Sequence, residues 1–470
     1  MYSLAPPFGQ IEVEEGLSPA DRASLAAERG PVNMAVAGAL IFEGDGLDHA
    51  VVRQRLQERL HLIPRYRQRL EQPALGLANP VWVDDSSFDV DWHVRRAQLA
   101  SPAGDAELAA FIGHEMSRRL DRARPLWELH VIERMAGGRV ALVPKMHHAL
   151  VDGVGAIDVG TVLLDPTPEP LEIPPPPEPW QPEPYDRARH LARLAATPVL
   201  RGQKLLLDSA ARALDTSPRQ AAEDLRRSTD LLAELARSRP QAPMTPLNSG
   251  LGPNRRWTQA RAGLEQIKRA ARSGDGKVND VLLAIVAGML RRYLDAAGVQ
   301  PERDPVALVP VSVRADDETE QLGNRISTVF VDLPIGEDDP VQRVRVIAEA
   351  MRELKQSSAV RAGALMVGAT GWAPPLVSSV LVRAVGGIRA FNLVVSNVPG
   401  PQQTFYLQGA RLLEAFPVVP LNPANQGLTV GILSYDGGVH FGLLADGDLD
   451  PGLEVAAAAL DQELLLYGGG

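Results

Sequence analysis

Two adjacent histidines, His147 and His148, stand ahead of an Asp-Gly pair in the segment PKMHHALVDG, residues 144–153. The apolar run RVALVPKM before them predicts a strand, and Gly153 and Gly155 give the backbone room to bend after them. Because side chains alternate along an extended backbone, the two imidazoles are expected to point to opposite sides. One would face a cleft, and the other would pack into its own domain. A neutral imidazole suits proton acceptance, since its unperturbed pKa is roughly 6.5.

Asp152 lies four residues beyond His148, and two roles are open for its carboxylate. It could orient a histidine, or it could fix the loop through a salt bridge; the bend in the chain favours the second role. A metal site is disfavoured, because the segment lacks the His-x-x-x-His spacing of helical ligands and the chain has no cysteine.

The composition of the 470-residue chain narrows the possible chemistry further. The absence of cysteine excludes disulfides and thiol nucleophiles, and a net charge of −10 argues against nucleic acid as a partner. The N-terminal stretch is acidic and lacks the apolar core of a secretory signal. No apolar run approaches the roughly 20 residues that span a bilayer. The sequence therefore predicts a cytoplasmic protein, either soluble or attached peripherally to a membrane.

Residues 1–165 carry an alternating pattern of strands and helices that predicts an N-terminal α/β domain. Helices are expected at 47–63, with Asp48 as N-cap, and at 105–120. Strands are expected at 33–44, 80–85, 89–94, 126–133 and 139–147.

Residues 166–243 are expected to connect this domain to a second one. Seven prolines at 166–177 favour an extended linker over a packed core. Residues 187–240 are arginine-rich with helical periodicity, and two interpretations are open: an interdomain crossover with solvated arginines, or a basic amphipathic surface that lies on anionic lipid.

Residues 244–470 repeat the α/β pattern, so two similar domains are expected to form a pseudo-dimer with the active site at their interface. Helices are predicted at 278–294, 340–356 and 361–385, and strands at 305–314, 327–334, 391–399, 428–437 and 439–446.

The segment HHALVDG, residues 147–153, matches the HHxxxDG signature of the CoA-dependent acyltransferase superfamily, which has a chloramphenicol acetyltransferase-like fold. Over residues 17–450 the chain resembles, more narrowly, the bacterial wax ester synthase/diacylglycerol acyltransferase family. The segments that carry this resemblance, in order, are LSPAD (17–21), RPLWELHVIE (124–133), VNDVLLA (278–284), PVSVR (310–314), LGNRIS (322–327) and SNVPGP (396–401).

The resemblance implies transfer of a long-chain acyl group from acyl-CoA, a substrate and not a cofactor, to the hydroxyl of diacylglycerol or of a long-chain alcohol. It implies His148 as general base, with His147 as its supporting neighbour. Asn279 resembles an asparagine proposed to stabilise the oxyanion, with a helix N-cap as its alternative role.

Other motif residues receive structural roles from the same resemblance. Asp152 and Gly153 would shape the histidine loop, with Arg314 as the ion-pair partner of Asp152. The tripeptide Pro125, Leu126 and Trp127 would form an apolar wall of the substrate pocket, although an interior tryptophan is also a common core residue.

Two other functions compete with lipid acylation. A related enzyme could acylate the hydroxyl of a polyketide or another secondary metabolite. The chain could also be a non-catalytic protein of the lipid-droplet surface, but its intact HHxxxDG motif argues against that. The family resemblance favours an enzyme that works at a membrane or lipid-droplet surface.

Overall fold

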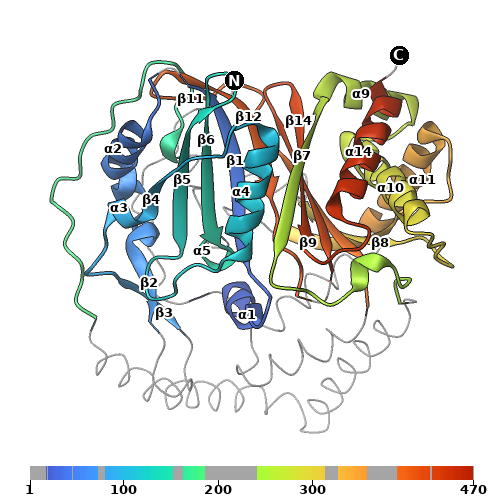
Figure 1. Ribbon diagram of the computed structural model, residues 1–470, viewed down its shortest axis with the longest axis horizontal. Coiled ribbons are helices and arrows are strands. Elements are labelled where there is room, and N and C mark those ends of the chain that lie inside the picture. The colour runs from blue at the N-terminus through green and yellow to red at the C-terminus, as the bar shows by residue number, and fades with distance from the viewer. Residues whose placement is uncertain are drawn as a thin grey trace, which may run out of the picture.

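The structure is a computed structural model that describes residues 17, 19–44, 46–71, 80–151, 162–185, 241–312, 326–356, 389–423 and 426–468. It is a mixed α/β protein with two six-stranded sheets that lie side by side (Figure 1). The predicted α/β class and two sheet-rich halves are confirmed. Predicted elements at 187–240 and 361–385 lie outside the described residues.

The first sheet contains, in spatial order, β11 (Tyr406–Leu407), β12 (Ala410–Val418), β1 (Ala35–Glu43), β6 (Arg139–His147), β5 (Trp127–Met135) and β4 (Val94–Ala97). The strands β5 and β6 form a hairpin through Gly137 and Gly138, which have φ angles of 76° and 69°. Glycine reaches this left-handed region without a Cβ penalty, so the pair turns the chain here.

The second sheet contains β7 (Arg255–Gly263), β14 (Gly438–Asp446), β13 (Leu428–Tyr435), β10 (Leu393–Pro399), β8 (Val306–Ser312) and β9 (Ile326–Asp332). A two-stranded sheet of β2 (Gln68–Glu71) and β3 (Val81–Asp84) completes the strands.

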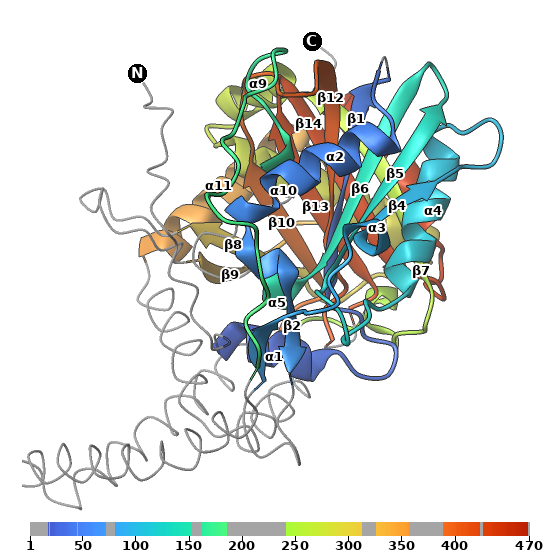
Figure 2. The same cartoon turned by 90° about the vertical axis from the view of Figure 1, so that its left-hand side faces the viewer.

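Helices cover the outer sides of both sheets (Figures 1 and 2). The helix α2 (His49–Arg59) begins as predicted, because the Asp48 side chain accepts a hydrogen bond from the Val51 amide at 2.9 Å. The second sheet is covered by α9 (Leu264–Ser273), α10 (Val278–Ala296), α11 (Pro340–Gln356) and α14 (Leu453–Gly468). Every residue of α10 from Asp280 to Leu290 is buried, because the sheet and its neighbouring helices enclose it.

The strand prediction for residues 89–94 is wrong. Val90–His93 form the short helix α3, and β4 begins only at Val94. The cause is local, since the Asp89 carboxylate accepts a hydrogen bond from the Asp91 amide at 2.9 Å and so caps a helical turn.

The two sheets are joined by a strand exchange. The strands β11 and β12 come from the C-terminal half of the chain, yet β12 pairs antiparallel with β1 in the first sheet. It packs so closely on the second sheet that a Cβ at Gly442 would lie 1.9 Å from the carbonyl oxygen of Pro417. The helix α4 (Asp105–Ser117) packs at the same place, where its Ile112 shares a core cluster with Trp257 and Phe416. The first sheet therefore contains strands from both sides of residue 244.

Residues 166–185 form no helix or strand, and they are held against the first half of the chain. Asp165, just before this segment, is fully buried and pairs with Arg55 at 2.9 Å and with Arg59 at 2.5 Å. Further along, the Arg67 guanidinium lies over the Trp180 ring, with 4.5 Å between the guanidinium carbon and the ring centroid. The segment therefore contacts the first half of the chain near both of its ends.

Candidate active site

The histidine pair stands at the point where the central strand β6 ends. The strand ends at His147, and the short helix α5 (His148–Val151) begins at the next residue. The His147 amide donates to the Leu126 carbonyl at 2.9 Å, and the His148 amide donates to the Met34 carbonyl at 3.0 Å. Each histidine backbone is therefore tied to a different neighbour of β6, which fixes where both side chains emerge.

His147 is the buried member of the pair, with 1% of its side chain exposed. Its Nδ1 accepts a hydrogen bond from the Ala149 amide at 3.0 Å, so the ring proton of the neutral form is assigned to Nε2. This Nε2 lies 3.7 Å from the Oε1 of Glu28. Burial lowers the pKa of His147 to about 4, although the nearby Glu28 carboxylate opposes that shift. A ring with such a low pKa and an engaged lone pair is a poor general base at neutral pH.

His148 differs from its neighbour because it is only half-buried. Its Nδ1 is enclosed, and no hydrogen bond to that atom is found within the described ranges. The His148 imidazole is thus held by its backbone and keeps part of its surface exposed. His147 is therefore buried and held by a hydrogen bond to its ring, whereas His148 is partly exposed.

The tripeptide 125–127 supports the histidines from the adjacent strand. Leu126 is fully buried and supplies the carbonyl that receives the His147 amide. Trp127 is a core residue: its Nε1 donates to the Tyr66 carbonyl at 2.7 Å, and its ring stacks on His93 with centroids 4.4 Å apart. Pro125 is also buried, at the entry to β5. The role of these residues in a pocket wall stays a prediction.

Asn279 lies in the first turn of α10, but it is not the N-cap. That position belongs to Lys277, whose amide donates to the Asp280 carboxylate at 2.8 Å, so the N-cap alternative is wrong. The Asn279 Oδ1 instead accepts a hydrogen bond from Asn397 at 3.1 Å. Asn397 belongs to the SNVPGP segment, which the sequence singled out without indicating this contact.

Three other motif residues, Asp152, Gly153 and Arg314, lie outside the described residues. Their assigned roles stay predictions. His148 and Asn279 belong to different halves of the chain. The His148 amide is bound by Met34, and the Asn279 side chain is bound by Asn397.

A second buried cluster, which the sequence did not reveal, contains Glu115, Glu128 and His130. The His130 Nε2 lies 3.5 Å from Glu115 and 3.4 Å from Glu128, so the three side chains could in principle hold a metal ion. Each carboxylate already pairs with an arginine, Arg118 at 3.0 Å and Arg95 at 3.3 Å. Because these arginines balance both negative charges, the cluster is a structural ion network.

Comparison with known proteins decides the family. Residues 17–282 match the wax ester synthase/diacylglycerol acyltransferase catalytic domain, and residues 322–466 match the WS/DGAT C-terminal domain. The chain belongs to the wax ester synthase/diacylglycerol acyltransferase family. The predicted resemblance is thereby confirmed, and the protein is an acyltransferase.

Members of this family from mycobacteria are similar along most of the chain. A probable diacylglycerol O-acyltransferase of Mycobacterium tuberculosis, tgs2, is 32% identical over 455 residues, which are 95% of this chain and 97% of that protein. A putative diacylglycerol O-acyltransferase of the same organism is 35% identical over 370 residues, 77% of each chain.

The fold of the wax ester synthase/diacylglycerol acyltransferase family also appears in solved structures. The enzyme of this name from Marinobacter aquaeolei VT8 is 28% identical, with a TM-score of 0.67, over 96% of this chain and 98% of that chain. The first condensation domain of the calcium-dependent antibiotic synthetase shares the fold at 17% identity and a TM-score of 0.56, over 97% and 96% of the two chains.

Proposed function

We propose that this acyltransferase moves a long-chain acyl group from acyl-CoA to the hydroxyl of diacylglycerol, and also to long-chain alcohols, with His148 as general base. The observation that carries the proposal is the difference in burial between the two histidines. Burial and the Ala149 amide hold His147 neutral, while His148 is accessible on a backbone fixed by Met34. The names of the mycobacterial relatives support diacylglycerol as acceptor.

The proposed reaction balances without a cofactor. The acceptor hydroxyl gives its proton to the imidazole of His148 as its oxygen attacks the thioester carbonyl, because an alcohol is far too weak an acid to ionise first. Negative charge develops on the carbonyl oxygen, where the side-chain amide of Asn279 is proposed to donate a hydrogen bond. The carbon–sulfur bond then breaks, and the CoA thiolate takes the proton from His148. This chemistry requires His148 and Asn279 to meet at the interface of the two sheets.

The experiment is a CoA-release assay on the purified protein with acyl-CoA and a panel of acceptors. Since the chain has no cysteine, a thiol reagent reports CoA alone and the assay needs no correction for protein thiols. We expect release with diacylglycerol, and a smaller release with long-chain alcohols. Release only with polyketide-like alcohols, or with no acceptor at all, would contradict the proposed substrate.

We further propose that the enzyme binds peripherally to a membrane or lipid-droplet surface. Within the described ranges, none of the helices combines the length and the apolar character required to cross a bilayer. The arginine-rich residues 187–240 would supply attraction to anionic lipid, at about 1 kcal/mol for each basic side chain near the surface. Flotation with anionic liposomes at low salt and release at high salt is expected. Binding that is insensitive to salt and to lipid charge would contradict this role.

A further inference from the structure

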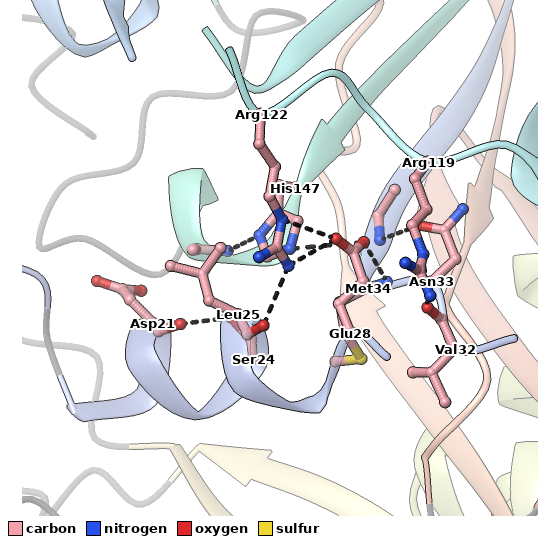
Figure 3. Close-up of polar contacts among 12 residues, drawn as sticks. Asp21, Ser24, Leu25, Glu28, Val32, Asn33, Met34, Arg119, Arg122 and His147 are labelled. Carbon is pink, nitrogen blue, oxygen red and sulfur yellow. Dashed lines mark hydrogen bonds and ion pairs between the residues drawn. The ribbon is translucent and has the colours of Figure 1, made fainter. Parts of the chain in front are cut away.

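Glu28, which follows α1 (Pro19–Ala27), connects the N-terminal helix to the histidine motif (Figure 3). Its side chain is 2% exposed, and both carboxylate oxygens are engaged. The Oε1 accepts a hydrogen bond from the Met34 amide at 3.2 Å, and the same oxygen lies 3.7 Å from the His147 Nε2. The Oε2 accepts from the Arg122 guanidinium at 2.8 Å.

Arg122 in turn fixes the carboxylate to the end of α1. Its Nη2 also donates to the Leu25 carbonyl at 3.0 Å, so the guanidinium bridges the helix backbone and the Glu28 side chain. Figure 3 shows the Arg122 and His147 side chains converging on Glu28. A buried carboxylate compensated in this way costs much less than an isolated one, because its charge is paired and hydrogen-bonded.

Two short routes lead from Glu28 to His148. In the first, Glu28 holds the Met34 amide, and the carbonyl of Met34 receives the His148 amide at 3.0 Å. In the second, the Glu28 carboxylate lies 3.7 Å from the His147 Nε2, beyond hydrogen-bond distance, and acts on the ring through its charge alone, while the His147 Nδ1 accepts from the Ala149 amide in the first turn of α5. Both routes act on the backbone that carries His148, since Met34 receives the His148 amide and Ala149 follows His148 in the chain.

We propose that Glu28, oriented by Arg122, is a positioning residue for acyl transfer: it holds the Met34 amide and places its negative charge beside His147, and thereby fixes the placement of His148. This inference rests on the proposed function of His148. Catalytic groups must be held in a productive geometry, and a displacement of roughly 1 Å can reduce the rate about a hundredfold. Glu28 should therefore affect kcat much more than the KM for acyl-CoA.

The test compares Glu28→Gln with a matched control, Glu133→Gln, by steady-state kinetics. Glu133 is also a carboxylate that pairs with an arginine, Arg96 at 2.8 Å, and accepts a backbone amide, that of His49 at 2.9 Å, but it lies outside this contact network. Glutamine keeps an oxygen for the Met34 amide, but it removes the charge beside His147 and replaces the oxygen that accepts from Arg122 by an NH2 group. We expect Glu28→Gln to lower kcat about tenfold or more, with KM for acyl-CoA unchanged, while Glu133→Gln keeps both constants.

A second variant covers the case in which Glu28→Gln does not fold. Arg122 is 35% exposed, and Arg122→Gln keeps a side-chain amide that can donate to Glu28 while it removes the charge that compensates the buried carboxylate. Its kcat should fall in the same direction, at unchanged KM. A folded Glu28→Gln or Arg122→Gln enzyme with wild-type kcat, in a background that still depends on His148, would overturn this inference alone. A wild-type protein without turnover, or an active His148→Ala variant, would instead overturn the proposed function.

Discussion

Asn397 donates a hydrogen bond from its Nδ2 to the Oδ1 of Asn279 across 3.1 Å, which joins β10 to the first turn of α10. An asparagine whose oxygen is engaged in this way presents its nitrogen to other partners. Because a developing oxyanion needs a donor, the contact gives Asn279 the orientation that its proposed role requires.

The asparagine pair can be tested by a double-mutant cycle. Asn279→Ala should lower kcat by about a hundredfold, the scale found when one oxyanion donor is removed. Asn397→Ala should give a smaller loss, and the double variant should be no worse than Asn279→Ala, because Asn397 acts only through its neighbour. Steady-state kinetics with acyl-CoA and diacylglycerol would supply the four rates. Additive losses would show that Asn397 has a separate role.

The two histidines should respond differently to replacement by alanine. His148→Ala should reduce kcat by at least about a hundredfold and leave the fold intact, because it removes a general base from a half-buried position. His147→Ala should also lower the free energy of unfolding, by about 1–3 kcal/mol, since it leaves the Ala149 amide without its buried acceptor. Kinetics and urea denaturation of both variants check this. A folded His148→Ala protein with near-normal turnover would exclude the proposed base.

Two buried histidines should make the stability depend on pH. Burial lowers the pKa of His147 and of His93 from 6.5 to about 4 in the folded protein. Between these values the unfolded chain binds protons that the folded protein does not, so the free energy of unfolding should fall as the pH decreases. Each histidine contributes at most about 1.4 kcal/mol for each pH unit, and its contribution is fully present above pH 6.5.

Replacing one of these histidines isolates its share of the effect. His93 stacks on Trp127, so His93→Phe keeps an aromatic ring in that place and removes the titrating group. Urea denaturation from about pH 7 to about pH 4.5 should show a shallower decline in stability for this variant than for the wild type. Equal slopes would mean that His93 takes up its proton in the folded state as well.

The order of many elements could be predicted from the sequence because it depends on local signals, but several elements, among them β7, α9 and α14, were not predicted. Periodic apolar positions predicted α10 and α11, and apolar runs predicted the strands β5 and β6. The strand β12 was not predicted, and its place beside β1 depends on pairing between segments far apart in the sequence. A local sequence pattern does not indicate which distant strand will pair with β1.

The residues of the candidate site could also be predicted only where a local motif marks them. The motif HHALVDG located His147 and His148, and strand alternation predicted that they face opposite ways. Glu28 carries no comparable signal, since its contact with Arg122 joins residues that are 94 positions apart. The Asn279–Asn397 contact likewise spans 118 positions, so only the fold shows that it exists.

Asp152 should behave as a structural residue if it pairs with Arg314. Both lie outside the described residues, so the pairing is argued from the family motif alone. Asp152→Ala should then lower the melting temperature together with activity, as loss of one partner of a buried ion pair costs about 3–5 kcal/mol. Thermal denaturation checks this. Unchanged stability combined with lost activity would make Asp152 a catalytic carboxylate.

Transfer should be direct, without an acyl-enzyme intermediate. A covalent route needs a thiol or an activated hydroxyl, but the chain has no cysteine and no G-x-S-x-G nucleophile motif. His147 cannot activate a second group, because its Nδ1 is engaged by the Ala149 amide and its pKa lies at about 4.

Both substrates must then be bound together before CoA leaves, so initial-rate plots with acyl-CoA and acceptor varied should intersect. Intact-mass spectrometry after incubation with acyl-CoA alone should show only the unmodified chain. His148→Ala provides the control, since any adduct that persists in it arises without the general base. Parallel rate plots, together with a single acylated residue that turnover requires, would establish a covalent route and leave His148 to activate that residue.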